Sequence, residues 1–230
     1  MTTVSQIKPD FSWDDIDTVL LDMDGTLLDK YFDDYFWEEY VPKVYGEIHG
    51  LEDQQARKEL LAKYQSVEST LAWTDLDYWS DRLGLNIPEL KCKVDHLIKV
   101  HPYVIDFLKY LKSINKEVHL VTNAHSKTLE IKMRKTAIGS WFDRIVCAEE
   151  VGEAKEQPVF WQGLEKILCY DRSRTLLADD TARVLRSARS YGMGYLLFIA
   201  KPSSRQPLRY SDEFCSVAFF NELIPGSRES

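Results

Sequence analysis

The 230-residue sequence has little cysteine and no cysteine pattern typical of a metal or redox site. There are four cysteines, none of them in a CxxC pair, at Cys92, Cys147, Cys169 and Cys215. Widely spaced cysteines of this kind disfavour a zinc site or a disulfide framework and are typical of reduced, mostly buried thiols. The sequence therefore predicts a protein of the cytoplasm.

Long apolar runs and an excess of positive charge are also missing. No stretch approaches the roughly 18 apolar residues of a membrane-spanning helix, and the N-terminal stretch, MTTVSQIKPDFSWDD, does not resemble a secretion signal. Lys and Arg number 29 against 37 Asp and Glu, which gives a net charge of −8. This charge argues against a nucleic-acid polymer or a membrane as the main partner, but it allows a small anion in a local pocket.

Short β-prone runs alternate with helical patterns over most of the chain. The expected strands are 18–21, 118–121, 144–148, 175–178 and 195–199, and the expected later helices are 102–112, 126–138, 158–168 and 181–191. Alternation of this kind predicts an α/β fold, in which a doubly wound parallel sheet carries helices on both faces.

The alternation is interrupted once, after the first expected strand. Residues 31–98 show helical periodicity only, with a kink or break expected at Pro42 and a helix end at Gly84. We therefore expect an α/β core formed by residues 1–30 and 99–230, with an inserted α-helical cap formed by residues 31–98.

Polar side chains follow the expected strands at the points where these end. They are Asp22 and Asp24, Thr122 and Asn123, and Asp179 and Asp180, while the third expected strand leads to a loop that carries Lys155. Because parallel strands end at one edge of a sheet, we expect these side chains to converge there. Neighbouring carboxylates repel one another, and Mg²⁺ is a cation that prefers oxygen ligands and would compensate this repulsion. A carboxylate can also attack phosphorus, while a second one assists proton transfer.

These segments resemble the four motifs of the haloacid dehalogenase superfamily, in the right order and over nearly the whole chain. The matching segments are DMDGT, LVTN, Lys155 and LADDT. The helical insertion lies where one subfamily of this superfamily has its helical C1 cap. The resemblance implies a Rossmann-like core and a magnesium-dependent enzyme.

Roles at the first motif are implied by this resemblance. Asp22 would be the nucleophile and a magnesium ligand. Asp24 would be the general acid and base and would offer its backbone carbonyl to the metal. Since a halide leaving group needs no proton, Asp24 favours hydrolysis of phosphate esters over cleavage of a carbon–halogen bond.

The other three motifs imply contacts with phosphate and metal. Thr122 and Asn123 would hold the phosphoryl group, and Lys155 would contact Asp22 and the phosphate. Asp180 would be the direct magnesium ligand, with Asp179 as a second candidate. The sequence departs from the family at two points. Val184 stands where a further acid is frequent, and Pro158 comes three residues after Lys155 instead of directly after it.

Four segments resemble bacterial GMP/IMP 5′-nucleotidases of the same superfamily, namely YFDDYFWEEYVPKVYG, LDYWSDRLGL, LVTNAHSKTLEIK and VGEAKEQPVFW. The resemblance implies hydrolysis of a purine nucleoside 5′-monophosphate through an aspartyl-phosphate. The alternatives are a phosphatase for another small phosphate such as phosphoglycolate or a sugar phosphate, a phosphomutase, and an inactive binding or regulatory module. The oligomeric state is left open.

Aromatic residues are frequent between positions 31 and 79, and helical spacing assigns most of them to packing. One or two near 31–35 or 73–78 are candidates to face the substrate. His125, two residues after Asn123, is a candidate for contact with the leaving group, whereas structural roles are expected for His49, His96, His101 and His119.

Overall fold

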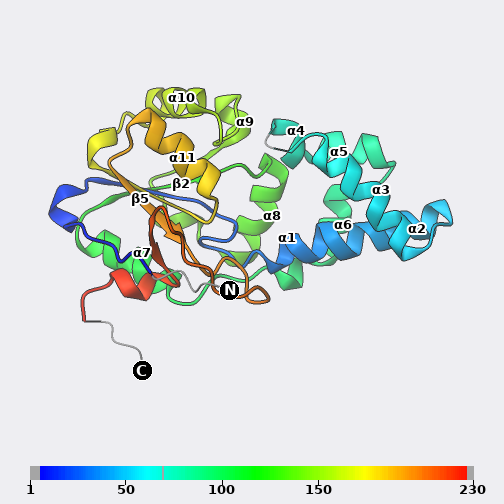
Figure 1. Cartoon of the computed structure of the whole chain (residues 1–230), viewed down its shortest axis with the longest axis horizontal. Coiled ribbons are helices and arrows are strands. Elements are labelled where there is room, and N and C mark those ends of the chain that lie inside the picture. Colours follow the sequence, from blue (N-terminus) through cyan, green and yellow to red (C-terminus); the bar gives the residue numbers. More distant parts are fainter. Residues whose placement is uncertain (1–5, 69, 227–230) are drawn as a thin grey trace.

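The computed structural model describes residues 6–68 and 70–226. A region built on a β-sheet and an all-helical region lie side by side (Figure 1). The outer ends of the expected core, 1–5 and 227–230, and residue 69 of the expected cap lie outside the described residues.

The sheet is parallel throughout, and its strand order is β3-β2-β1-β4-β5-β6. The strands are β1 (Thr18–Leu21), β2 (Glu117–Thr122), β3 (Arg144–Cys147), β4 (Thr175–Asp179), β5 (Tyr195–Ile199) and β6 (Cys215–Val217). This order confirms the predicted doubly wound α/β fold. Strand β6 was not predicted, because three residues give too short a run to show a period of two.

Helices cover both faces of the sheet, and the side chains of β1 alternate between them. Val19 and Leu21 belong to one buried cluster, with helix α7 (Val104–Ser113). Leu20 belongs to the other, with helices α10 (Pro158–Leu168) and α11 (Ala182–Tyr191). Figure 1 shows α10 and α11 on one side of the sheet and α7 on the other. Burial on both faces explains why the central strands are apolar along their whole length.

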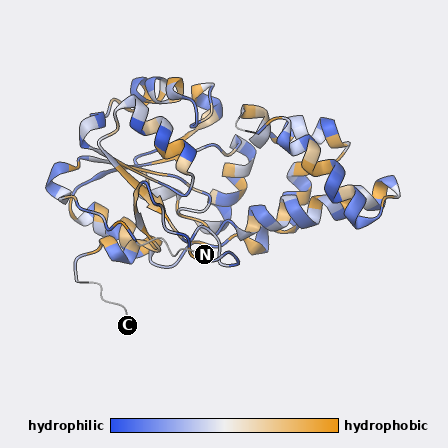
Figure 2. Cartoon of the chain, viewed as in Figure 1, coloured by the Kyte–Doolittle hydropathy of each residue, from blue (hydrophilic) through white to orange (hydrophobic). Residues whose placement is uncertain are grey.

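Residues 31–98 contain helices and no strand among those that the structure describes. The helices are α1 (Tyr31–Tyr35), α2 (Val41–His49), α3 (Asp53–Gln65), α4 (Leu71–Thr74), α5 (Leu76–Leu83) and α6 (Ile87–Lys93). Several of them show separate hydrophilic and hydrophobic stretches, as expected of helices with one buried side (Figure 2). The insertion is where the sequence predicted it, while its status as a separate domain stays a prediction.

The helical path continues through Pro42 instead of breaking there. A π-helical segment, Phe36–Tyr40, joins α1 to α2, and the N–H of Val41 donates to the carbonyl of Phe36. Pro42 has no N–H to donate to the preceding turn, and the wider π turn adapts the helix to this loss. The expected break is therefore replaced by a local change of helix type.

The remaining elements connect the sheet. They are helices α8 (Ser126–Thr136) and α9 (Ala148–Val151), and the short 3-10 turns Trp13–Asp15, Asp95–Leu97, Gly139–Trp141, Arg172–Arg174 and Phe220–Leu223. Helix α8 follows β2 and lies between the sheet and the all-helical region (Figure 1). None of the helices in the described ranges is both long and apolar enough to cross a membrane.

The cysteines are less buried than the sequence analysis predicted. All four are free thiols, but Cys92 and Cys169 are exposed and the other two are half-buried. Cys169 ends helix α10 in the left-handed conformation, with φ of 54°. Its place at a helix end on the surface explains the error, since composition says nothing about the position of a residue in its helix.

Candidate active site

The predicted site residues meet at the edge of the sheet where the strands end. Asp22 directly follows β1, Thr122 is the last residue of β2, and Asp179 is the last residue of β4. The strand order changes direction between β1 and β4, and open α/β sheets bind ligands beside such a point. A cavity of about 530 Å³ lies here, and residues of the 31–98 region form its other walls.

Three carboxylates form an acidic group on the floor of this cavity. One oxygen from each of Asp22, Asp179 and Asp180 lies within 4.8 Å of the others. Burial raises the pKa of Asp22 to about 7, and repulsion from Asp179 and Asp180 adds to this while Lys155 opposes it. Three carboxylates whose oxygens lie this close together, and which still raise the pKa of Asp22 despite Lys155, are a chemical fit for a small hard cation, so this group could hold a metal ion.

Lys155 joins two of these carboxylates. Its side chain is 2% exposed, and its Nζ donates to Asp22 Oδ1 at 2.5 Å, Asp179 Oδ2 at 2.7 Å and the Val121 carbonyl at 3.1 Å. Burial alone would lower the pKa of Lys155, but Asp179 and Asp22 outweigh it and raise the pKa. All three ammonium protons are directed at protein atoms, so Lys155 fixes the spacing of the two carboxylates.

Asp179 and Asp180 differ in their partners. Besides Lys155, Asp179 accepts a hydrogen bond from the N–H of Thr181 at 2.8 Å. Asp180 pairs with Lys30 Nζ at 2.9 Å and accepts from the hydroxyl of Thr181 at 3.2 Å. Lys30 was not among the residues predicted from the sequence. Both carboxylates belong to the acidic group, and the choice of Asp180 as the direct metal ligand stays a prediction.

Gly25 explains why a glycine follows the two aspartates of DMDGT. Its φ is +88°, a conformation that favours glycine. A Cβ at this position would lie 2.5 Å from Asp180 Oδ2. The turn after β1 therefore approaches the acidic group so closely that a side chain would displace Asp180.

The carboxylate of Asp24 has a different partner from that of Asp22. It lies 2.5 Å from Nζ of Lys132, a residue of helix α8. Burial raises the pKa of Asp24 to about 6, with Lys132 opposing the rise and Asp33 adding to it. A carboxyl group with this pKa can both hold and release a proton near neutral pH, as a general acid and base must.

Thr122 and Asn123 also lie at the cavity, but their side chains have local partners. The Thr122 hydroxyl oxygen accepts from the N–H of Ala124 at 3.0 Å. The Asn123 side chain accepts from the N–H of Lys155 and donates to Glu156, both at 2.9 Å. Asn123 therefore ties the loop that carries Lys155 to the end of β2, and its predicted contact with a phosphoryl group stays untested.

The helical region contributes aromatic walls to the cavity, from Trp37, Tyr64, Trp73 and Trp79. The Tyr64 ring makes edge-to-face contacts with the other three, with centroid distances between 5.0 and 6.1 Å. Trp73 lies in one of the two stretches that were predicted to face the substrate. The described cavity lining does not include Tyr31 or Tyr35 from the other stretch.

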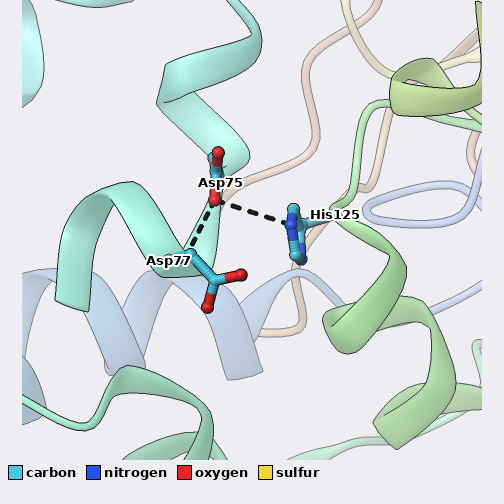
Figure 3. A group of neighbouring side chains, drawn as sticks. All are labelled: Asp75, Asp77 and His125. Atoms are coloured by element: carbon cyan, nitrogen blue, oxygen red, sulfur yellow. Dashed lines mark hydrogen bonds and ion pairs between the residues drawn. The ribbon is translucent and has the colours of Figure 1, made fainter. Parts of the chain in front are cut away.

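His125 lines the cavity and also faces a second acidic group (Figure 3). Its Nε2 lies 3.5 Å from Asp75 Oδ1. This Asp75 oxygen accepts from the N–H groups of Asp77 and Tyr78 and thus caps helix α5, while Lys127 binds the carboxylate of Asp77. The carboxylates of Asp75 and Asp77 therefore both have partners within the protein. We assign this second acidic group to helix capping and to contact between the two regions.

Residues that the sequence analysis missed connect Asp24 to the helical region. Lys132 Nζ lies 2.5 Å from Asp33 Oδ2 in helix α1, and Lys91 Nζ of helix α6 lies 2.9 Å from Asp33 Oδ1. Both lysines are almost fully buried, with side-chain exposures of 1% and 2%. The sequence did contain a signal for their burial. Residues four apart lie on the same face of a helix, and Lys132 follows the buried Thr128 in α8 by four positions, as Lys91 follows the buried Ile87 in α6.

Comparison with known proteins identifies the family of the chain. The family model of the haloacid dehalogenase-like hydrolases matches residues 16–192. The GMP/IMP nucleotidase YrfG of Escherichia coli K12 is 35% identical over 214 residues, which cover 93% of this chain and 96% of that protein. The pyrimidine 5′-nucleotidase YjjG of the same organism is 28% identical over 186 residues, covering 76% and 79% of the two chains.

Solved structures agree on the fold. The crystal structure of an HAD phosphatase from Thermococcus onnurineus has a TM-score of 0.74 at 20% identity, with coverage of 90% of this chain and 96% of that chain. The family model includes the first, second, third and fourth motif segments, and the similarity to YrfG extends through the helical region. The chain belongs to the haloacid dehalogenase-like hydrolases.

Proposed function

We propose that the protein is a magnesium-dependent phosphomonoester hydrolase whose substrates are the purine nucleoside 5′-monophosphates GMP and IMP. The observation that carries the proposal is the 35% identity to a GMP/IMP nucleotidase over 93% of the chain. It includes the helical region, which forms the walls that a leaving group would meet. The arrangement of Asp22, Lys155, Asp179 at the end of β4 and Asp180 directly after it supports phosphoryl transfer independently.

The proposed reaction has two steps. An oxygen of Asp22 attacks phosphorus, the bond between phosphorus and the ester oxygen breaks, and Asp24 gives its proton to the departing nucleoside oxygen. Water then attacks the phosphorus of the aspartyl-phosphate and loses a proton to Asp24. The bond between phosphorus and Asp22 breaks, which releases inorganic phosphate and restores both carboxyl groups.

The protein groups around Asp22 support this assignment. Lys155 fixes the orientation of the nucleophile through its bond to Asp22 Oδ1. Thr122 keeps its hydroxyl proton available for a phosphoryl oxygen, because its oxygen acts as an acceptor toward Ala124. Asp22, Asp180 and Asp179, with the backbone carbonyl of Asp24, would hold Mg²⁺, which when bound neutralises the carboxylates and the charge of the phosphate.

The cavity supports a substrate of nucleotide size. Its volume of about 530 Å³ lies within the range of about 300–1,000 Å³ for small-molecule sites. Its aromatic wall, formed by Trp37, Tyr64, Trp73 and Trp79, is suited to contact with a planar base. The proposal includes residues 31–98 as a cap domain over a core of 1–30 and 99–230, and a cytoplasmic location.

A panel of phosphate esters tests the substrate. Initial rates of phosphate release would be measured with Mg²⁺ for GMP, IMP, AMP, CMP, UMP, phosphoglycolate and glucose 6-phosphate. The proposal predicts the highest kcat/KM for GMP and IMP, at least about tenfold above the others, since one base-specific contact is commonly worth about 1–3 kcal/mol. Equal values across the panel would reject the nucleotide assignment while leaving the phosphatase. Transfer of label between positions of a sugar phosphate, without phosphate release, would indicate a mutase.

A further inference from the structure

Lys132 is a buried cation shared by two carboxylates from different regions. It belongs to helix α8 of the α/β region, and its Nζ lies 2.5 Å both from Asp24 Oδ1 and from Asp33 Oδ2. Asp33 belongs to helix α1, the first helix of the all-helical region. One ammonium group therefore connects the end of β1 to that region.

The far side of Asp33 is fixed as well. Its second oxygen accepts from Nζ of Lys91, which lies over the rings of Phe32 and Phe36 at 4.9 and 4.7 Å from their centroids. Burial would raise the pKa of Asp33, but Lys132 and Lys91 outweigh it and keep Asp33 charged. Asp33 is therefore a fixed anion that holds the same ammonium group as Asp24 does.

Core packing alone does not explain this arrangement. Desolvating two ammonium and two carboxylate groups is costly, and apolar residues of similar volume often stabilise such a site equally well or better. Charge-assisted hydrogen bonds do, however, fix the orientation of the side chains that they join, which apolar contacts do not. The chain of contacts ends at Asp24, the group to which the mechanism assigns proton transfer.

We propose that Lys132 is a positioning residue for Asp24, and that it ties the placement of Asp24 to the helical region through Asp33. The carboxyl group is then aligned with the ester oxygen only while helix α1 is seated against α8. The proposal rests on phosphoester hydrolysis with Asp24 as acid and base, and it is independent of which nucleotide is hydrolysed.

The test compares Lys132→Met with wild type on two esters of the same size, phenyl phosphate and 4-nitrophenyl phosphate, with Mg²⁺. The phenolate leaving group is the stronger base and needs a proton from Asp24 more than the nitrophenolate does. We expect Lys132→Met to lower kcat/KM for phenyl phosphate at least about tenfold more than for 4-nitrophenyl phosphate. Equal losses on both esters, or no loss, would overturn the proposal.

Three further variants separate positioning from folding. Lys91→Met removes a buried lysine that contacts Asp33 but not Asp24, so its selective loss on phenyl phosphate should be clearly smaller than that of Lys132→Met. Asp33→Asn, the second variant if Lys132→Met does not fold, should show a selective loss in the same direction. In an Asp24→Asn background, Lys132→Met should lower kcat/KM for phenyl phosphate by less than about threefold further, because the effects of residues that act as a unit are not additive. Full additivity would contradict action through Asp24.

The same assay keeps this proposal apart from the substrate proposal. GMP hydrolysis by wild type is measured in parallel, and a lack of preference for GMP would reject only the substrate. Wild type that is inactive on both aryl esters and on GMP would reject the phosphatase and the positioning role together.

Discussion

The carboxylate of Asp22 lies at a buried position beside two other carboxylates, where its negative charge is disfavoured. Burial and the neighbouring Asp179 and Asp180 raise its pKa to about 7, although Lys155 donates to it. This conflict has a consequence for stability. Because the native chain binds a proton at Asp22 that the unfolded chain has lost above its ordinary pKa of 3.8, native stability falls as pH rises from about 4 to 7.

Replacing Asp22 with Asn should remove this pH dependence. Between pH 5 and pH 8, without divalent metal, the free energy of unfolding of Asp22→Asn should rise relative to wild type by up to about 3 kcal/mol. Urea unfolding of both chains in EDTA at the two pH values measures this difference. Asp24 titrates in both chains, and the part of its raised pKa that the charge of Asp22 causes is lost in Asp22→Asn, which adds to the difference in the same direction. A difference that stays constant, or that shrinks toward pH 8, would show that Asp22 is not held with a raised pKa.

The residues of the acidic group were predictable because they follow strand ends that the apolar pattern reveals, and Lys155 because its segment resembles the third motif of the family. Lys30 and Lys132 were not predicted, since their partners lie 150 and 108 residues away in the sequence. Only the fold brings such pairs together. A lysine on the buried face of an expected helix is nevertheless a usable warning of a buried ion pair, and Lys132 gave that warning.

At the scale of single elements, the N-terminus of helix α5 is capped by Asp75. This cap was not predicted from the sequence. The Asp75 side chain accepts from the N–H groups of Asp77 and Tyr78 and faces His125. Capping hydrogen bonds of this kind contribute about 1 kcal/mol. The helix that they begin carries Leu76 and Trp79, which line the cavity.

Asp75→Ala should therefore lower the free energy of unfolding by about 1 kcal/mol, or the melting temperature by about 2–4 °C for a chain of this size. Asp75→Asn is the matched control, because asparagine caps a helix nearly as well as aspartate while lacking its charge. It should lose clearly less. Thermal unfolding followed by circular dichroism measures both, and similar losses for the two variants would mean that the charge toward His125, and not the cap, supplies the stability.

Helices and strands were predicted correctly where the segment was long enough to show a periodic pattern of apolar residues, and were missed where it was too short. The expected helix at 158–168 matches α10 (Pro158–Leu168), in which a proline opens the first turn. Strand β6, with three residues, and the π-helical segment before Pro42 were missed. Both depend on tertiary packing more than on a local pattern.

At the scale of the whole molecule, the two regions share one buried cluster but also meet through charged pairs. The buried cluster on one face of the sheet continues into Phe32, Phe36 and other residues of the helical region. Ion pairs cross between the regions at Lys127–Asp77, Lys135–Asp95 and Arg183–Glu68, and all of them are partly exposed. Exposed pairs are each worth about 0–1 kcal/mol, so these three contribute little to holding the two regions together, in contrast to the buried cluster and the buried pair of Lys132 and Asp33.

A metal bound between β1 and β4 should stabilise the whole fold. At a Mg²⁺ concentration 100 times its Kd, the gain is about 2.7 kcal/mol, which raises the melting temperature by about 5–10 °C over the value in EDTA. Differential scanning fluorimetry measures the shift. Asp180→Asn should reduce it strongly. Asp77→Asn, in the second acidic group, should keep all of it, and a shift lost in Asp77→Asn but kept in Asp180→Asn would move the metal to the other group.

The central claim is that Asp22 is the nucleophile of a nucleotidase, and its most direct test is the turnover of GMP by Asp22→Asn. Phosphate release would be measured with Mg²⁺ at matched protein concentration, after circular dichroism has shown that both chains are folded. We expect wild type to release phosphate and Asp22→Asn to be slower by at least about 1,000-fold, as on loss of a catalytic nucleophile. A folded Asp22→Asn variant with a rate near that of wild type would contradict the claim.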